Sequence, residues 1–181
     1  VAPSRGLGDV YKRQVAHILR TEVDSIMNIR SHPQAIIMGD FNDYPTNQSI
    51  LKILKAEAPP VKTNDLASTT DSANASTVTP SSLKLYHLLA RKAKSKNFGS
   101  YKFRGEWGLL DHLIVSGTLL NQSNHFFTSE EKANVCLLPF LLKDDEKYGD
   151  KEPFRTYKGM KYQGGISDHL PIYTDFELIV Y

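Results

Sequence analysis

A short apolar run that ends in polar residues is the feature that most constrains this chain. Residues 35–39 read Ala-Ile-Ile-Met-Gly, and Asp40, Phe41 and Asn42 follow at once. A run of this length, closed by turn residues at 43–45, predicts a strand buried on both faces. Alternate residues of a strand point the same way, so we expect Asp40 and Asn42 together at one rim of a sheet, with Phe41 turned into the core. Open α/β sheets bind their ligands at such a rim.

Apolar residues on either side of this run recur at three- and four-residue steps, and this spacing predicts two amphipathic helices. The first spans residues 15–29. The second is capped by Thr46 or Asn47 and continues to about Ala58, where two prolines stop it. The expected core faces are Val15, Ile18, Leu19, Val23, Ile26 and Ile29 in the first helix, and Ile50, Leu51, Ile53 and Leu54 in the second. A helix, a strand and another helix in succession are typical of an α/β fold.

The middle of the chain combines a polar stretch with a third apolar pattern. Residues 63–82 are rich in Ser, Thr, Asn and Ala, which predicts a long surface loop. A helix capped by Ser81 or Ser82 is predicted next, with its apolar face formed by Leu83, Tyr86, Leu89, Ala90 and Ala93. His87 lies outside this face, so we expect it to be solvated.

Basic and aromatic residues alternate in the following segment. Lys102 and Arg104 alternate with Tyr101 and Phe103 on a predicted strand, a pattern that suits contact with phosphate groups and bases. A solvated surface explains the same pattern equally well. For the preceding basic run, residues 91–96, the simpler interpretation is that its charges complement the dipole at a helix end.

Two further acidic positions are notable for their surroundings. Asp111 lies in an apolar strand pattern, residues 109–116, where a buried carboxylate is costly unless a polar partner pairs with it. We therefore expect such a partner. Ser167, Asp168 and His169 precede a predicted closing strand, residues 172–180, and an adjacent carboxylate and imidazole there could supply a metal ligand and a titratable base. Taken singly, each of these sites is explained equally well by a purely structural role as by a functional one.

Length and composition bound the rest of the interpretation. A chain of 181 residues, 40% of them hydrophobic, is long enough for one domain with one sizeable core, and its apolar runs are too short to span a membrane. The lone cysteine, Cys136, lies in an apolar run and is most simply a core thiol. Nothing in the sequence indicates an oligomer.

The first fourteen residues look like the translation of a transposon-type sequencing adapter rather than native sequence. They contain three basic residues and one acidic residue, so the remainder of the chain carries no formal net charge. Charge therefore gives no argument for a nucleic-acid partner. We expect residues 15–181 to be the native part.

The three polar sites, taken together and in their order along the chain, resemble a known family. Residues 39–42 (Gly-Asp-Phe-Asn), Asp111 in its strand and residues 167–169 (Ser-Asp-His) are similar to motifs in the second half of the endonuclease/exonuclease/phosphatase superfamily, the deoxyribonuclease-like phosphoesterases. The resemblance implies a four-layer α/β sandwich, in which two mixed sheets pack face to face between outer helices. It also implies metal-dependent attack of water on a phosphate ester, usually with Mg²⁺ and with Mn²⁺ as the alternative ion.

The resemblance assigns a role to each matching residue. Asp40 would orient or deprotonate the attacking water, and Asn42 would donate a hydrogen bond to the phosphate. His169 would contact the scissile phosphate, and Asp111 would hold a catalytic histidine, either His169 or one outside this chain. Asp168 would reach the metal directly or through water, and Asp40 is the second implied metal ligand. All five are implied catalytic residues.

The resemblance also implies an incomplete domain and leaves the substrate open. The family's early metal-ligand pair, an Asn or Asp and a Glu, has no match here, so residues 15–181 are expected to be the C-terminal part of a domain whose N-terminal half is missing, and to be inactive or poorly folded alone. The expected substrate is a phosphate ester, with DNA as one candidate and Lys102, Arg104 and Trp107 as candidate contacts. A nuclease-like phosphodiesterase is favoured over a phosphomonoesterase, a sphingomyelinase-like enzyme or a non-catalytic binding module.

Overall fold

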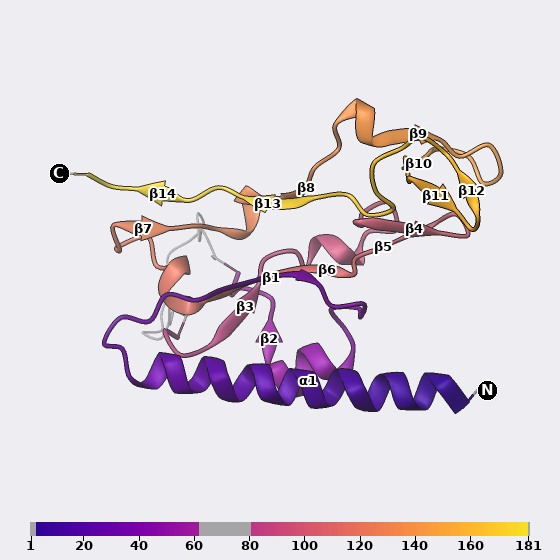
Figure 1. The fold of residues 1–181 in the computed structure, drawn as a ribbon. Coiled ribbons are helices and arrows are strands. Elements are labelled where there is room, and N and C mark those ends of the chain that lie inside the picture. Colours follow the sequence, from indigo (N-terminus) through magenta and orange to yellow (C-terminus); the bar gives the residue numbers. More distant parts are fainter. Residues whose placement is uncertain (1–2, 62–80, 181) are drawn as a thin grey trace, which may run out of the picture.

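A long helix lies against one face of a four-stranded sheet in the computed structural model, which describes residues 3–61 and 81–180 (Figure 1). The helix, α1, spans Pro3–Asn28. The strand order is β1-β6-β3-β2, with β1 at Ile36–Asp40, β6 at Asp111–Ser116, β3 at Leu85–His87 and β2 at Ala56–Glu57. The β2–β3 pair is parallel and the other two pairs are antiparallel, so the sheet is mixed.

Five further antiparallel strand pairs make up much of the remaining described chain. They are β4 (Tyr101–Phe103) with β5 (Glu106–Gly108), β7 (Phe126–Phe127) with β14 (Glu177–Leu178), β8 (Ala133–Val135) with β13 (Ile172–Thr174), β9 (Leu142–Asp144) with β10 (Lys151–Pro153), and β11 (Tyr157–Lys158) with β12 (Lys161–Tyr162). Short helical turns connect them: η1 (Ser49–Leu54), η2 (Lys92–Lys94), η3 (Gly117–Leu120), η4 (Glu130–Lys132) and η5 (Pro139–Leu141).

The central strand β6 has an apolar core on each of its faces. Ile114 packs with residues of α1 and η1, whereas Leu113 and Val115 pack with β8 and the partly buried Ile172 of β13. These contacts place α1 on one side of the sheet and the β8–β13 pair on the other, as Figure 1 shows. The strand alternation of β6 thus joins three layers.

The structure confirms a mixed α/β fold and corrects several local predictions. The four-layer sandwich with two mixed sheets is not confirmed, because only one mixed sheet is present among the described residues. None of the described helices combines the length and apolar character that crossing a membrane requires. The predicted surface loop, residues 63–82, lies almost wholly outside the described part of the chain.

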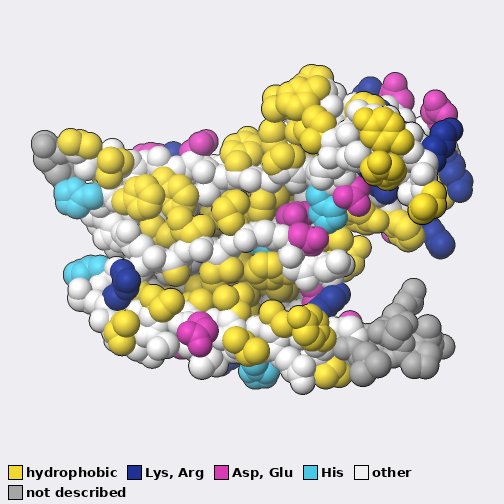
Figure 2. Space-filling view, in the orientation of Figure 1, with side chains coloured by type: hydrophobic (Ala, Val, Ile, Leu, Met, Phe, Trp, Pro, Cys, Tyr) yellow, Lys and Arg dark blue, Asp and Glu magenta, His cyan; other side chains and the backbone are white. Residues whose placement is uncertain are grey.

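The strand prediction for residues 35–39 is right in type and wrong in burial. β1 pairs with β6 alone and forms one edge of the sheet. Ile36 is 47% exposed and Met38 is 57% exposed, so the strand is not buried on both faces. Figure 2 shows a band of hydrophobic side chains on this side of the molecule.

The first predicted helix is present, but its buried face differs from the predicted one. The buried residues are Ala16, Val23 and Met27. Four residues assigned to the core are exposed, namely Val15, Ile18, Ile26 and Ile29. The helix also begins at Pro3, so the adapter-like residues continue it. Two apolar stripes therefore run along α1, and the sheet covers one of them.

The next two predicted helices are replaced by shorter elements. The second is reduced to η1, which buries Ile50 and Leu54, leaves Leu51 exposed and has Gln48 at its cap. The third is absent, because residues 85–87 form β3. Leu85, Leu88 and Leu89 are all fully buried, so their spacing reflects enclosure from all sides rather than one helical face. At the C-terminal end, the predicted strand is divided into β13 and β14, with Leu178 and Val180 exposed.

Candidate active site

The loop after β1 places an acid and an amide at the rim of the sheet. Asp40 is the last residue of β1, and its Oδ1 accepts a hydrogen bond of 2.7 Å from the backbone N–H of Asn42. Asn42 has a φ of 52°, a left-handed conformation that Asn tolerates better than most residues. Both residues are exposed, whereas Phe41 packs against the core between α1 and the sheet. The alternation expected from the sequence is therefore present.

Asp111 faces this loop from the neighbouring strand and has two polar partners. It is the register partner of Asp40 in the β1–β6 pair. Its Oδ2 lies 2.7 Å from Nδ1 of His169 and accepts a 2.5 Å hydrogen bond from the hydroxyl of Ser100. These are the partners that a carboxylate in an apolar strand requires. Of the two options left by the sequence, the histidine beside Asp111 is His169 of this chain.

Ser100 also fixes the segment that carries His169, although its sequence context gave no signal of this. Its carbonyl accepts a hydrogen bond of 2.7 Å from the N–H of Leu170. The adjacent Tyr101 forms a β-bridge with His169, and the two rings lie 4.9 Å apart between centroids. Ser100 is itself fully buried. One residue therefore holds both the carboxylate and the backbone next to the imidazole.

Three of these side chains converge closely enough to share a cation. One ligand atom each from Asp40, Asp111 and His169 lies within 4.8 Å of the others. Carboxylate oxygens are the ligands that Mg²⁺ and Mn²⁺ favour, and one imidazole is compatible with Mn²⁺. The donor set therefore fits a divalent metal of this kind. Asp168, the other expected ligand, is exposed and is not part of this cluster.

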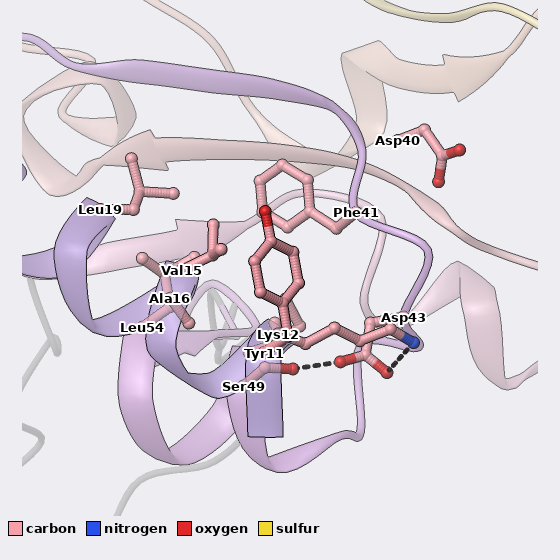
Figure 3. Close-up of a pocket in the computed structure, with 11 residues that line it drawn as sticks. Tyr11, Lys12, Val15, Ala16, Leu19, Asp40, Phe41, Asp43, Ser49 and Leu54 are labelled. Atoms are coloured by element: carbon pink, nitrogen blue, oxygen red, sulfur yellow. Dashed lines mark hydrogen bonds and ion pairs between the residues drawn. The ribbon is translucent and has the colours of Figure 1, made fainter. Parts of the chain in front are cut away.

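A pocket of about 330 Å³ lies behind the loop, between the loop, η1 and the middle of α1. Figure 3 shows the Phe41 ring on the pocket side and the Asp40 carboxylate pointing away from it. Asp43 is buried at the pocket wall, where its carboxylate accepts hydrogen bonds from Ser49 and Asn47 and lies 3.7 Å from the ammonium group of Lys12. Of the cluster, Asp40 alone lines the pocket, and its carboxylate points out of it.

The three residues expected to contact substrate have very different environments. Lys102 is only 4% exposed, and its ammonium group pairs with Asp145 at 3.2 Å and donates to the carbonyls of Gly149 and Lys151. This arrangement corrects the expectation for Lys102, because its ammonium group is enclosed and already bonded. Arg104 is exposed in the turn after β4, and Trp107 is half-buried across the hairpin from Lys102. For Arg104 and Trp107, substrate contact stays a prediction.

The loop of residues 145–151 stabilises the charged form of Asp145, the acid that lies beside Lys102. Burial raises the pKa of Asp145, but hydrogen bonds from the Tyr148 N–H, Lys102 and the Lys147 N–H outweigh it, and the net pKa is lowered. Asp145 is therefore charged at neutral pH, and the pair is an internal ion pair. It links the β4–β5 hairpin to residues 145–151.

Two histidines behind the site were not identified from the sequence. His87, expected to be solvated, is fully buried, and its Nε2 lies 2.6 Å from Nδ1 of the equally buried His112. Burial, followed by the neighbouring His112, lowers the pKa of His87 to about 3. Burial also lowers the pKa of His112, although the Asp43 carbonyl and nearby carboxylates oppose this. Both rings are neutral at neutral pH.

The mixed sheet carries two carboxylates and a carboxylate-bound histidine at one rim, a combination typical of metal-dependent hydrolytic sites. A family model described as endonuclease/exonuclease/phosphatase family matches residues 3–178. The chain belongs to this family. Membership indicates a hydrolase acting on phosphoester bonds, of a kind that is generally metal-dependent. No curated protein and no solved structure matched the chain.

Proposed function

We propose that this chain carries the water- and phosphate-binding part of a Mg²⁺-dependent phosphodiesterase with nuclease-like chemistry. The observation that carries the proposal is the convergence of Asp40, Asp111 and His169, with His169 fixed by its 2.7 Å contact to Asp111. Hydrolysis of a phosphate ester requires an oriented water, stabilisation of charge on the phosphate oxygens and a proton carrier. This rim of the sheet supplies side chains suited to each task.

Each residue is assigned a task that its contacts permit. Because a carboxylate only accepts, neutral His169 carries its proton on Nδ1 toward Asp111, and Nε2 is left to exchange a proton with substrate. Asp40 orients the attacking water or removes its proton. The side-chain amide of Asn42, exposed at the rim, donates to a phosphate oxygen.

A bound Mg²⁺ or Mn²⁺ would neutralise charge on the phosphate and lower the pKa of a coordinated water. Asp40 and Asp111 would hold it from the described cluster, and Asp168 is assigned to it directly or through water. Without a cation, the two carboxylates repel each other across the β1–β6 pair.

The uncovered edge of the sheet supports the further proposal that this chain is one part of a larger domain. Ile36 and Met38 point to the same face as Val115 and Leu113, their buried register partners on β6. An apolar strand edge left open in this way is usually paired or covered. We assign the cover to an N-terminal half that also brings the missing Glu and Asn metal ligands. The isolated chain is therefore expected to lack turnover.

The test measures turnover by the protein that the full-length gene encodes. The substrates are double-stranded DNA, sphingomyelin and a phosphomonoester, each assayed in Mg²⁺ and in EDTA. Asp40→Ala and His169→Ala should each abolish turnover, and Glu22→Gln, at an exposed acid of α1, serves as the matched control. Cleavage of DNA in Mg²⁺ supports the nuclease-like assignment. Sphingomyelin or phosphomonoester turnover would replace it with the corresponding activity, and retained turnover in both alanine variants would overturn the site.

A further inference from the structure

A continuous hydrogen-bonded chain crosses the interior of the sheet and ends on the candidate-site loop. It begins at the N–H of Leu89, which lies 3.1 Å from Nδ1 of His87. Nε2 of His87 lies 2.6 Å from Nδ1 of His112, and Nε2 of His112 lies 2.9 Å from the carbonyl oxygen of Asp43. Both rings are fully buried, so water cannot substitute for any of these partners.

The two ends of this chain determine where both protons lie. A backbone N–H can only donate, so Nδ1 of His87 accepts and its proton is on Nε2. That proton is donated to Nδ1 of His112, which leaves the second proton on Nε2 of His112. A carbonyl can only accept, so Asp43 receives this last proton. Every donor has an acceptor only when both rings are neutral and both are the Nε2–H tautomer.

The last bond acts on the backbone that carries the candidate catalytic groups. Asp43 directly follows Asn42, which has a left-handed φ of 52° and whose N–H donates to the Asp40 carboxylate. His112 also stacks on Phe41, with 4.9 Å between ring centroids. His112 therefore holds the loop at two points, one on each side of Asn42.

We propose that His87 and His112 are positioning residues that act as a pair, called the relay, in which each ring carries its proton on a fixed nitrogen. His87 fixes the tautomer and orientation of His112, and His112 fixes the conformation of the Asp40–Asn42 loop. Neither residue contacts substrate. The role of the loop in catalysis rests on the proposed function, whereas the relay itself is a property of this chain.

The first test needs no substitution and no turnover. Long-range ¹H–¹⁵N correlation spectra of the 181-residue protein at about pH 7 distinguish a protonated ring nitrogen from an unprotonated one. The relay predicts two histidines with protonated Nε2, unprotonated Nδ1 and slow exchange with solvent. A protonated Nδ1 on His112, or two solvent-like histidines in place of the buried pair, would overturn the proposal.

The second test separates the relay from a role local to β3. His87→Gln places an amide near the position of Nε2 and can still donate to His112, whereas His87→Asn places its amide near Nδ1 and can only replace the bond with Leu89. The relay predicts that the His87→Gln variant retains a single sharp Nε2–H signal of His112 and the amide chemical shift that Asn42 has in the unmodified protein. The His87→Asn variant should show a broadened or split Nε2–H signal of His112 and a changed amide chemical shift of Asn42. His17→Gln, at an exposed histidine of α1, is the control.

The outcomes of the second test are distinct. Equal spectra for the Gln and Asn variants, or retention by Asn and loss by Gln, would assign His87 to local packing and reject the relay. Failure of the phosphodiesterase proposal would appear as absent turnover in the full-length protein and would leave these spectra unchanged.

Discussion

Two neighbouring strands of the same sheet, β6 and β1, pair apolar residues on one face, but the environments of these residues are opposite. Leu113 of β6 is 1% exposed, and Met38, its register partner on β1, is 57% exposed. The pair Val115 and Ile36 repeats the contrast, with exposures of 0% and 47%. The β8–β13 pair packs over β6, and this cover ends before β1.

The contrast teaches that an apolar strand stabilises this chain only where another layer covers it. Burial of a Leu or Met side chain contributes about 1.5 to 3 kcal/mol, and an exposed one contributes a small fraction of that. The apolar residues on the outer face of β1 therefore add little to the stability of the described structure. Under the proposed cover, their burial would contribute fully to stability.

The largest expected effect compares the two register partners directly. Leu113→Ala should lower the free energy of unfolding by about 2 to 5 kcal/mol, because it leaves a cavity in a covered core. Met38→Ala should lower it by less than about 1 kcal/mol, because its side chain is largely in solvent. Urea denaturation of both variants measures the difference. Equal losses would mean that β1 is covered in solution.

Acid should destabilise the protein through the central strands. Because the pKa of folded His87 is about 3 and that of an unfolded histidine is about 6.5, the unfolded state binds more protons between these values. The contribution of His87 to stability is therefore nearly constant above about pH 6.5 and falls as the pH decreases, by roughly 3 kcal/mol at pH 4.

His87→Phe removes the group responsible for this loss and provides the comparison. Its unfolding free energy, measured by urea titration at several pH values, should decline less steeply than that of the unmodified protein. Parallel curves for the two proteins would show that His87 is already accessible to protons in the folded state.

A substitution at Gly39 tests the end of β1, where the constraint is the backbone conformation and not burial under another layer. Its φ of 138° lies in a region that residues with a Cβ rarely adopt, although no atom lies within 4 Å of the position a Cβ would take. Gly39→Ala should therefore cost about 1 to 3 kcal/mol from strain alone. Thermal unfolding measures this, and Gly8→Ala in α1, which has the same open space, should not destabilise.

The smallest effect is expected for a charge on the open face. Met38→Lys should change the stability of the 181-residue chain by no more than about 0.5 kcal/mol, since the long side chain can reach solvent. In the full-length protein the same change should cost several times more, because the proposed covering strands would bury it. Similar small effects in both proteins would contradict the proposed cover.

The residues of the candidate site could be identified from the sequence because the patterns that mark them are local. Asp40 and Asn42 follow an apolar run, and Asp111 interrupts one, so alternation and the cost of burying a carboxylate located them. The structure then supplied the partner of Asp111, which no local signal identifies. His169 lies 58 residues further along the chain, and Ser100 has no distinguishing neighbour.

The errors came from residues whose environment is set by distant segments. His87 lies outside a helical stripe in sequence, yet on β3 it is fully buried and contacts His112 of the neighbouring strand β6. Ile18 and Ile26 belong to a valid helical face, but the sheet contacts the adjacent one. Periodicity reports which faces are apolar, and it does not report which of them will be covered.

The single hydroxyl and carbonyl of Ser100 also determine when the site can appear during folding. The contacts that join Ser100 to Asp111 and Leu170 close loops of very different length, and the longer one forms only after residue 170 has been synthesised. Contacts between distant residues form slowly, because chain entropy is lost before they are made. The imidazole should therefore meet its carboxylate only in the last steps of folding. A partly synthesised or partly unfolded chain would then not contain the assembled candidate site.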